Sequence, residues 1–374
     1  MSDPPSQDFS TDIDEYALDA DEASSLTGHT LAGRYVVRQK LGEGAMGQVY
    51  LGEHTLIKKP VAIKVLHPEL SANKEVMARF QREAQASATI NHPNLCAATD
   101  FGSTSRGEFF LVMEFLEGRT LEQLISAHGR LDERRVLFII DQLCKVLDIA
   151  HTHGIIHRDL KPENLMLIAN EDTEDFVKVM DFGIASMVEE GAESENTRLT
   201  RQGIAYGTPA YMSPEQVLGE DVDARSDLYT VGVILFEMLT GEVPFNGRTV
   251  KKVMSKHLTT PVPTMLEAGA PHVHPALESI VRKLMEKEPE DRIQSARQLR
   301  QALREITFSD LPWSDAAMPL DFITLHSGEI AIAAAPLPTA ATAPKSVAEA
   351  DSTIGWLLGR FMALPLSMRI TLVA

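Results

Sequence analysis

The sequence has only two cysteines, Cys96 and Cys144, among its 374 residues. Two cysteines cannot build a disulfide framework and do not form a zinc-binding pattern, so we expect a reducing cytosol. Basic residues are also scarce, because 35 Lys and Arg stand against 53 Asp and Glu, which gives a net charge of −18. This balance argues against nucleic acid as the main partner, since no broad basic face can neutralise phosphates.

The two ends of the chain lack the patterns of a signal peptide and of a clean membrane span. Residues 1–32 contain acids but no Lys or Arg, which predicts an acidic disordered tail, with a docking or autoregulatory segment as the alternative. Residues 307–353 are expected to form a flexible Ala/Pro-rich linker. Residues 354–374 are apolar but interrupted by Arg360, Pro365 and Arg369, short of the ~20 clean residues that cross a bilayer. They predict either a truncated transmembrane start or an interfacial helix.

Between these ends the composition is that of a soluble globular protein, with 44% hydrophobic and 24% charged residues. Two predicted strands, residues 34–41 and 48–53, enclose glycines at 42, 44 and 47. Glycines at this spacing let a backbone lie close over phosphates, although a flexible turn is the alternative. A Rossmann loop leads from a strand into a helix, whereas this loop leads from a strand into a strand.

A lysine interrupts the next apolar strand, residues 61–66. The two-residue period puts Lys64 on the face of Ala62, where a charge is costly without a partner. In a predicted helix over 73–90, Glu83 shares a stripe with apolar or small residues and could pair with Lys64; an exposed Glu is the alternative. A further strand, residues 109–113, leads into a connector that we expect to be a hinge between two lobes.

The larger lobe is helical by pattern, and its first long helix is predicted to begin at an Asp132 cap. That helix leads into residues 157–164, His-Arg-Asp-Leu-Lys-Pro-Glu-Asn, and a strand over 177–180 leads to Asp181. Phosphoryl transfer needs a carboxylate to accept a hydroxyl proton, a cation and oxygen ligands for Mg²⁺. Alone, the octet could be a polar loop. The histidines at 151, 153 and 157 have no Cys or Glu partner at a ligand spacing typical of a zinc site, and we expect His157 to be packed under the loop.

Two further segments complete this lobe. Residues 184–212 form a long Ser-, Thr- and Glu-containing stretch, and such a run inside a compact domain is usually functional. Residues 228–239, preceded by Asp227, predict a buried helix, and more helices follow to about Ile306.

Together these motifs resemble the bacterial, eukaryotic-like Ser/Thr protein kinases over about residues 33–306. They occur in the family's order: the glycine loop, Val-Ala-Ile-Lys64, Glu83, the octet, Asp181-Phe-Gly, Gly207-Thr208-Pro209, Ser213-Pro-Glu215, Asp227 and Arg292. The resemblance implies an α+β, bilobal kinase fold. Its N-lobe would hold an antiparallel β-sheet and one regulatory helix, and its C-lobe would be mainly α-helical. Ser213 departs from the commoner Ala but is small enough to be tolerated.

The resemblance also implies the roles of individual residues. ATP would be bound by Leu41, Gly42, Glu43, Gly44, Ala45, Met46, Gly47, Gln48, Val49, Ala62, Lys64, Glu83, Met113, Glu114, Leu116 and Met166. Catalysis would fall to Asp159, Lys161 and Asn164. Asn164 and Asp181 would hold Mg²⁺, with Mn²⁺ as the alternative. Glu215 would pair with Arg292 as a structural strut, and Asp227 would anchor the catalytic loop from beneath.

Regulation and specificity follow from the same resemblance. Lys161 marks Ser/Thr kinases, and Thr208 would bond to Asp159 and Lys161. Arg158 would await a phosphate on the activation loop, with Thr197 and Thr200 as the acceptors.

We therefore expect an ATP-dependent, non-specific serine/threonine protein kinase that is regulated by autophosphorylation. Its partners would be protein substrates and a second copy for trans-autophosphorylation. The kinase domain would be cytoplasmic, with membrane association through the C-terminal segment. The alternatives are a pseudokinase scaffold or signalling-partner binding module, and a small-molecule phosphotransferase.

Overall fold

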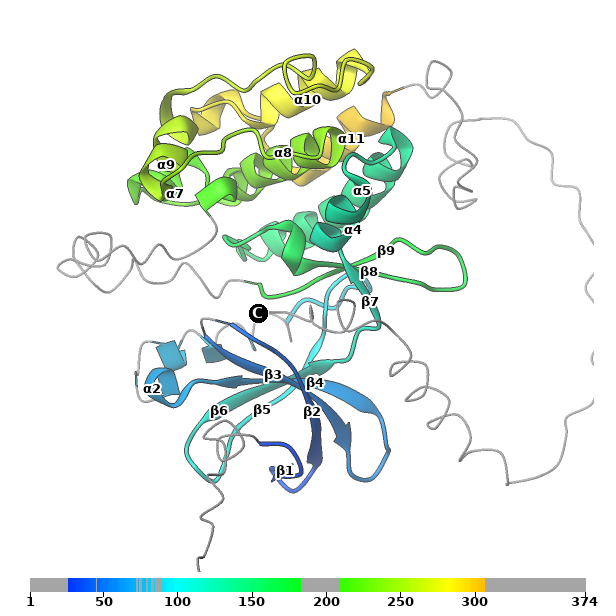
Figure 1. The fold of residues 1–374 in the computed structure, drawn as a ribbon, viewed down its shortest axis with the longest axis vertical. Helices are drawn as coiled ribbons and strands as arrows, with labels where there is room; N and C mark the ends of the chain where they lie inside the picture. Colours follow the sequence, from blue (N-terminus) through cyan, green and yellow to red (C-terminus); the bar gives the residue numbers. More distant parts are fainter. Residues whose placement is uncertain are drawn as a thin grey trace, which may run out of the picture.

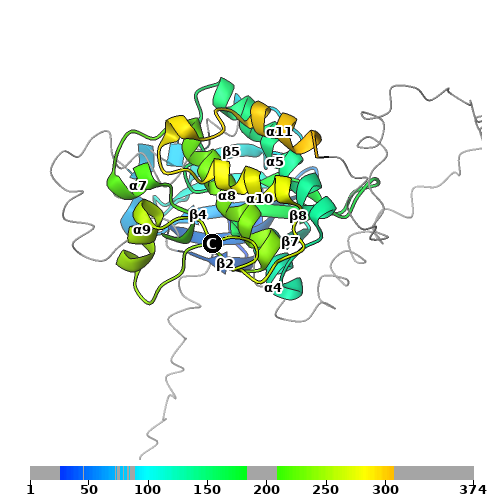
Figure 2. The same cartoon turned by 90° about the horizontal axis from the view of Figure 1, so that it is seen from above.

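The computed structural model describes residues 26–44, 46–71, 73, 76–78, 80–81, 84, 89–182 and 209–306. Within these parts, two lobes lie one above the other along the long axis (Figure 1). The N-lobe, residues 26–114, is built from strands, and the C-lobe, residues 118–306, is mainly helical. Figure 2 looks along that axis, with the C-lobe helices in front of the strands. The bilobal α+β fold expected from the sequence is confirmed.

The N-lobe holds a six-stranded sheet in the order β1-β2-β3-β4-β6-β5, in which every neighbouring pair is antiparallel. Its strands are β1 (Thr30–Leu31), β2 (Tyr35–Glu43), β3 (Gly47–His54), β4 (Pro60–Leu66), β5 (Ala98–Ser103) and β6 (Phe109–Glu114), with the short helix α2 (Pro68–Ser71) after β4. The four strands predicted from the pattern are confirmed as β2, β3, β4 and β6. The sequence gives no sign of β5, whose Asp, Gly and Ser residues disfavour strands. Half of the predicted helix over 73–90 lies outside the described residues. Between residues 73 and 90, the residues that are described are helical.

The alternation along β4 divides the N-lobe into two apolar clusters. Val61, Ile63 and Val65 belong to one cluster, whereas Ala62 packs in the other. Lys64 therefore lies on the Ala62 face, as the two-residue period predicts, and only 5% of it is exposed.

The backbones of β3 and β4 approach each other closely at Gly47, the first residue of β3. A Cβ atom added at Gly47 would lie 2.0 Å from the carbonyl oxygen of Val65, which is backbone and cannot move aside easily. A side chain at this position would therefore force β3 away from β4. The sheet itself requires glycine here.

The C-lobe begins with a small antiparallel sheet that lies at the boundary between the lobes (Figure 1). Its strands are β7 (Gly118–Thr120), β8 (Leu165–Ile168) and β9 (Phe176–Val179). The helices are α4 (Leu121–His128), α5 (Glu133–Thr152), α7 (Pro214–Leu218), α8 (Ala224–Thr240), α9 (Val250–Thr259), α10 (Pro275–Leu284) and α11 (Ala296–Arg304), and the 3-10 turns are η1 (Pro162–Asn164), η3 (Pro209–Tyr211) and η4 (Pro289–Asp291).

Capping residues set where the two long helices begin. Asp132 accepts hydrogen bonds from the backbone N–H groups of Arg134 and Arg135 at 3.0 and 3.4 Å, so α5 begins where the sequence predicts. The buried helix α8 begins earlier than predicted, because Asp223 caps it at the N–H of Arg225, 2.7 Å away. Asp227 therefore lies inside the first turn of α8 rather than before the helix.

Helix α8 forms the centre of the C-lobe core. Most of its residues are buried against α5 and α10. A Cβ atom added at Gly232 would lie 2.8 Å from Leu284 Cβ and from Met285 Cγ, so this glycine permits close packing of α8 on the end of α10. The core thus holds α8 rigidly beneath the loop that precedes β8.

Candidate active site

The residues of the octet lie on a loop that connects α5 to β8. The amide nitrogen of Asn164 donates to the backbone oxygen of Asp159 at 2.8 Å and to its carboxylate at 3.5 Å. Lys161 Nζ lies 3.7 Å from Asp159 Oδ2. The structure therefore brings the three predicted catalytic side chains together at the lobe boundary.

Beneath this loop, the carboxylate of Asp227 accepts three hydrogen bonds. The backbone N–H groups of His157 and Arg158 donate to it at 2.9 Å each, and His151 Nε2 donates at 2.8 Å. Burial raises the pKa of this carboxyl, but the hydrogen bond and charge of His151, and then His157, lower it more, so its pKa lies below its usual range. The predicted anchoring of the loop by Asp227 is confirmed.

Asp181 follows β9 and faces the N-lobe. Its Oδ1 lies 3.0 Å from Lys64 Nζ, and the two side chains are only 7% and 6% exposed. A lysine in an apolar strand needs a charged partner, and among the described residues this partner is Asp181. Glu83, the partner expected from the sequence, lies outside those residues.

Two residues of the site have left-handed backbone conformations. Arg158 has φ 64° and Asp181 has φ 55°, and neither is glycine. Such conformations cost free energy and persist only where the surroundings determine them. Around Arg158 these surroundings are Asp227 below and the amide of Gln216, which donates to the Arg158 oxygen at 2.7 Å.

A mostly apolar depression lies next to Asp181, between the lobes. It is lined by Val49, Ala62, Cys96, Met113, Glu114, Leu116, Met180 and Asp181. Five of the predicted ATP-binding residues and the predicted metal ligand Asp181 are therefore brought together here. Met166 does not line the depression but is fully buried in the same apolar cluster.

Sequence reasoning missed Cys96 and Met180 in this lining. The signal for Met180 was its place directly before Asp181, at the end of a predicted strand. Cys96 gave no such signal, because its position depends on the pairing of its N–H with the oxygen of Val179, 2.8 Å away.

The glycine loop joins β2 to β3 near this depression. Gly42 pairs with Val49 and Glu43 with Gln48, and the Gly44 N–H donates to Gly47 oxygen at 2.8 Å. Of the other residues predicted in this loop, Leu41 is buried, with 5% of it exposed, and Met46 is partly buried. Ala45 lies outside the described residues. The predicted regulatory residues Thr197, Thr200 and Thr208 also lie outside them.

The predicted strut between Glu215 and Arg292 is confirmed as a buried pair. Two guanidinium nitrogens donate to the two carboxylate oxygens at 2.7 Å each. Ser226 also donates to this carboxylate. Burial raises the pKa of Glu215, but the hydrogen bond and charge of Arg292, and then the hydrogen bond of Ser226, together lower it more, so the pKa lies below its usual range. The pair holds α7 against the turn before α11.

The three histidines around the octet have structural roles. His157 is fully buried, donates from Nε2 to the Met180 oxygen at 2.9 Å and packs on the ring of Phe182. His151 contacts Asp227, and His153 donates to the oxygen of Ile149. The predicted packing of His157 under the loop is confirmed.

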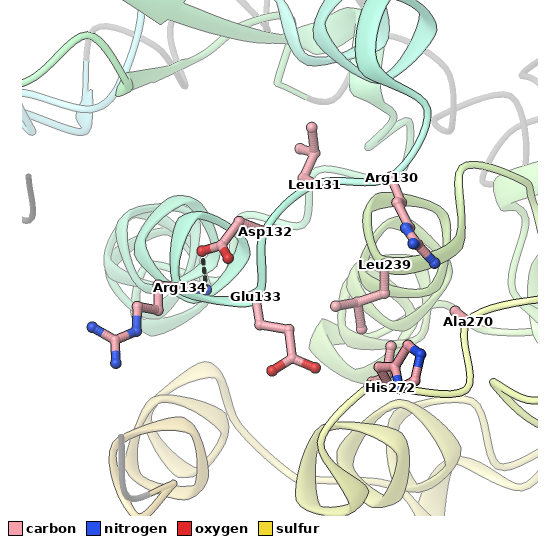
Figure 3. A pocket seen from close by; sticks show the side chains of 9 residues that line it. Arg130, Leu131, Asp132, Glu133, Arg134, Leu239, Ala270 and His272 are labelled. Atoms are coloured by element: carbon pink, nitrogen blue, oxygen red, sulfur yellow. Dashed lines mark hydrogen bonds between the residues drawn. The ribbon is translucent and has the colours of Figure 1, made fainter. Parts of the chain in front are cut away.

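A second depression lies far from these groups, at the start of α5 and the end of α8 (Figure 3). It is lined by Arg130, Leu131, Asp132, Glu133, Arg134, Leu239, Ala270, His272 and Val273. Burial raises the pKa of Glu133, which points into this space. None of the predicted site residues lies there, so the depression between the lobes is the candidate active site.

Known proteins resemble this chain in sequence and in fold. The family model described as protein kinase domain matches residues 35–303. The chain is 38% identical to the serine/threonine-protein kinase Pkn3 of Myxococcus xanthus over 348 residues, which are 92% of this chain and 60% of that protein. It is 39% identical to the serine/threonine-protein kinase PknB of Mycolicibacterium smegmatis over 290 residues, which are 76% of this chain and 45% of that protein. The chain thus spans only part of the length of these relatives.

A solved structure has the same fold. The crystal structure of the Mycobacterium tuberculosis PknI kinase domain superposes with a TM-score of 0.59 at 27% identity, covering 75% of this chain and 99% of that domain. Family match, fold and site geometry agree, and the chain belongs to the protein kinase family.

Proposed function

We propose that this chain is an active serine/threonine protein kinase that transfers the γ-phosphate of ATP to protein hydroxyl groups. One observation carries the proposal. Lys64 and Asp181 meet at 3.0 Å beside an apolar depression, and Asp159, Lys161 and Asn164 cluster on the adjoining loop. A nucleotide-binding depression next to a proton acceptor is what phosphoryl transfer to a hydroxyl needs.

Each side chain has a distinct part in this proposal. Asp159 orients the substrate hydroxyl and accepts its proton, for which its carboxylate is suitably exposed at 23%. Lys161, 3.7 Å away, steadies the transferring phosphoryl group. Lys64 contacts the α- and β-phosphates, and the loop between β2 and β3 covers the phosphates.

Members of this family use ATP and a divalent metal ion, and the residues present fit such an ion. The amide nitrogen of Asn164 donates to Asp159, which leaves the amide oxygen of Asn164 as a ligand for the ion. The Asp181 carboxylate supplies a second hard oxygen ligand. We propose Mg²⁺ as the ion, with Mn²⁺ as the alternative. When bound, it neutralises charge on the phosphates. Lys64 holds the Asp181 carboxylate in place for this role.

We propose that Arg158 makes the site switchable. Its backbone is fixed by Asp227 and Gln216, so the guanidinium projects from a rigid base. A phosphate on Thr197 or Thr200 would give it a strong charged partner. Autophosphorylation in trans, within a homodimer, would supply that phosphate. The double variant Thr197→Ala/Thr200→Ala should lose most activity; unchanged activity would place the switch elsewhere.

The function is tested by phosphate transfer from γ-labelled ATP to the protein itself and to a generic protein substrate. Wild type should label both with Mg²⁺ or Mn²⁺ present, and Asp159→Asn and Lys64→Met should label neither. Nucleotide binding without transfer in wild type would instead support a pseudokinase scaffold. Comparing phosphoproteomes of wild-type and Lys64→Met cells would identify the protein substrates.

We propose a cytoplasmic kinase domain, with the segment 354–374 associating with the membrane. Within the part of the chain that the structure describes, no helix has both the length and the apolarity to cross a bilayer. The segment 354–374 lies outside that part. Co-sedimentation of the full chain with vesicles, against a chain ending at 353, tests the association.

A further inference from the structure

A partly buried ion pair joins the two lobes behind the candidate nucleotide site. Lys178 lies on β9, and its Nζ is 2.7 Å from Oε1 of Glu114, the last residue of β6. The side chains are 12% and 24% exposed. Glu114 also lines the depression, so one residue contributes to the nucleotide site and to a contact between the lobes.

The backbone between the two partners tightens this contact. The N–H of Ala97 donates to the same Glu114 Oε1 at 2.9 Å, and the Glu114 N–H donates to the Ala97 oxygen at 3.1 Å. Lys178 Nζ donates also to the Leu95 oxygen at 3.4 Å. The Glu114 carboxylate is thus held from two directions, by the chain before β5 and by β9.

The next residue along β9 is fixed to the same segment. The N–H of Val179 donates to the Asn94 oxygen, and its oxygen accepts from the Cys96 N–H, both at 2.8 Å. Two residues further, Asp181 contacts Lys64. A chain of hydrogen bonds and neighbouring β9 residues therefore connects Glu114, through Lys178, to Asp181.

The distance and the low exposure make this pair a stable contact between the lobes. A charge-assisted hydrogen bond at 2.7 Å between largely desolvated groups is stronger than an exposed pair. Without Lys178, the Glu114 carboxylate would keep only the Ala97 N–H and would turn toward water. The Glu114 backbone, at the depression that this residue lines, would then be held only by its pairing with β4 and its hydrogen bond to the Ala97 oxygen.

We propose that Lys178 is a positioning residue for the nucleotide: by holding the Glu114 carboxylate, it fixes the Glu114 backbone that recognises the adenine edge. The inference rests on the proposed function, and on the expectation from the family resemblance that backbone groups of Glu114 hydrogen-bond the adenine edge. Lys178 does not touch the nucleotide in this role; it acts through Glu114.

The test compares Lys178→Met with Lys178→Arg. In Lys178→Met, the KM for ATP and the dissociation constant for ADP should each rise roughly fivefold, because part of one charge-assisted hydrogen bond is lost. The kcat should change less than about twofold. The preference for ADP over GDP should fall, since the 6-amino group is recognised by a loosened backbone. Lys178→Arg should restore most of the affinity.

The matched control is Arg135→Met. Arg135 forms a similarly buried bidentate pair with Asp175, at 2.7 Å for each bond, directly before β9 but away from the depression. This control should lower stability without changing the KM for ATP. If Lys178→Met does not fold, Glu114→Gln keeps an acceptor for the Ala97 N–H while removing the charge, and the same fall in affinity is expected.

Unchanged ADP affinity in Lys178→Met would overturn the inference, even if stability fell. A raised kcat with unchanged KM would also overturn it, because the pair would then restrain the lobes rather than position the nucleotide. If wild type binds ADP but transfers no phosphate, the proposed function fails, and the ADP and GDP affinities still decide the role of Lys178. If wild type binds no nucleotide, both proposals fail.

Discussion

The underside and the working face of the catalytic loop are held in opposite ways. Below, the Asp227 carboxylate is 1% exposed and receives its three hydrogen bonds at 2.8 to 2.9 Å. Above, the Asp159 carboxylate is 23% exposed and has contacts at 3.5 and 3.7 Å. Short contacts fix the backbone from below, whereas only long contacts hold the Asp159 carboxylate, the group that we propose accepts the hydroxyl proton. The difference indicates that the acid holding this loop, Asp227 of α8, is distinct from the acid on the loop to which we assign the chemistry.

The largest effect is expected from Asp227→Ala, which removes the carboxylate that holds the loop from below. It leaves the N–H groups of His157 and Arg158 buried without their acceptor, so we expect a loss of about 3–5 kcal/mol in the free energy of unfolding. Phosphate transfer should be lost as well. Urea unfolding measures the first effect. The control Asp223→Ala removes the cap of the same helix and a partly exposed ion pair with Arg225, and should cost about 1 kcal/mol; equal losses in both variants would contradict the assigned role.

Asp159→Asn should separate the two faces. Removing a positioned proton acceptor is expected to slow phosphate transfer roughly 10²- to 10⁴-fold. The free energy of unfolding should change by less than about 1 kcal/mol, because the contacts of this carboxylate are long and partly exposed. Transfer kinetics and urea unfolding on the same preparations give both values. A large loss of stability would show that Asp159 is structural too.

A third prediction uses pH to probe a buried group below the site. His257 is fully buried, with Nδ1 2.9 Å from the Tyr229 hydroxyl; burial, and then the charge of Lys287, lower its pKa to about 4. The unfolded state therefore binds the proton more tightly. The stability contributed by neutral His257 is complete above pH 6.5 and is lost as pH falls toward 4, by up to about 3 kcal/mol.

The measurement is the free energy of unfolding between pH 4 and 7. The variant His257→Gln should be less stable at pH 7 but should show a smaller decline toward acid than wild type. Since other histidines titrate in both proteins, the difference between the two slopes isolates His257. Parallel slopes would contradict the assignment.

The smallest expected effect comes from Gln216→Ala. This variant removes the 2.7 Å hydrogen bond to the Arg158 oxygen and also the acceptor of the Ser213 N–H at the start of α7, so we expect a loss of about 1 kcal/mol in stability and less than a tenfold fall in transfer rate. The exposed residue Gln298, which accepts from the Gln294 N–H, provides the control Gln298→Ala. A loss in Gln216→Ala no larger than in this control would show that the underside depends on Asp227 alone.

Much of the fold was predictable because its signals are local. Alternation along β4 placed Lys64, a capping Asp placed the start of α5, and the order of motifs gave the family. The Glu215–Arg292 strut and the Asp227 anchor were predicted through the family's motifs rather than through their surroundings. Helix α4 was missed because it is short, and its start depends on the reciprocal hydrogen bonds of Thr120 and Gln123.

Contacts between segments that are distant in the sequence could not be predicted. Lys178 and Glu114 are 64 positions apart, and nothing in either neighbourhood indicates their pairing. Cys96 enters the depression only because its backbone pairs with β9. The start of α8 was misjudged because the apolar run begins after Asp227, while the helix begins at the polar residues before it. Such features arise from the docking of the two lobes and from caps outside apolar patterns.

The glycine at position 47 changes how the glycine motif should be interpreted across related chains. Its Cβ would collide with the backbone of β4 at 2.0 Å whether or not a nucleotide is bound. Selection on the hairpin alone would therefore retain this glycine in a descendant that had lost ATP binding. An intact glycine at this position is for that reason a poor criterion for separating active kinases from inactive ones, whereas Asp159, with long contacts and a partly exposed carboxylate, has no comparable structural role.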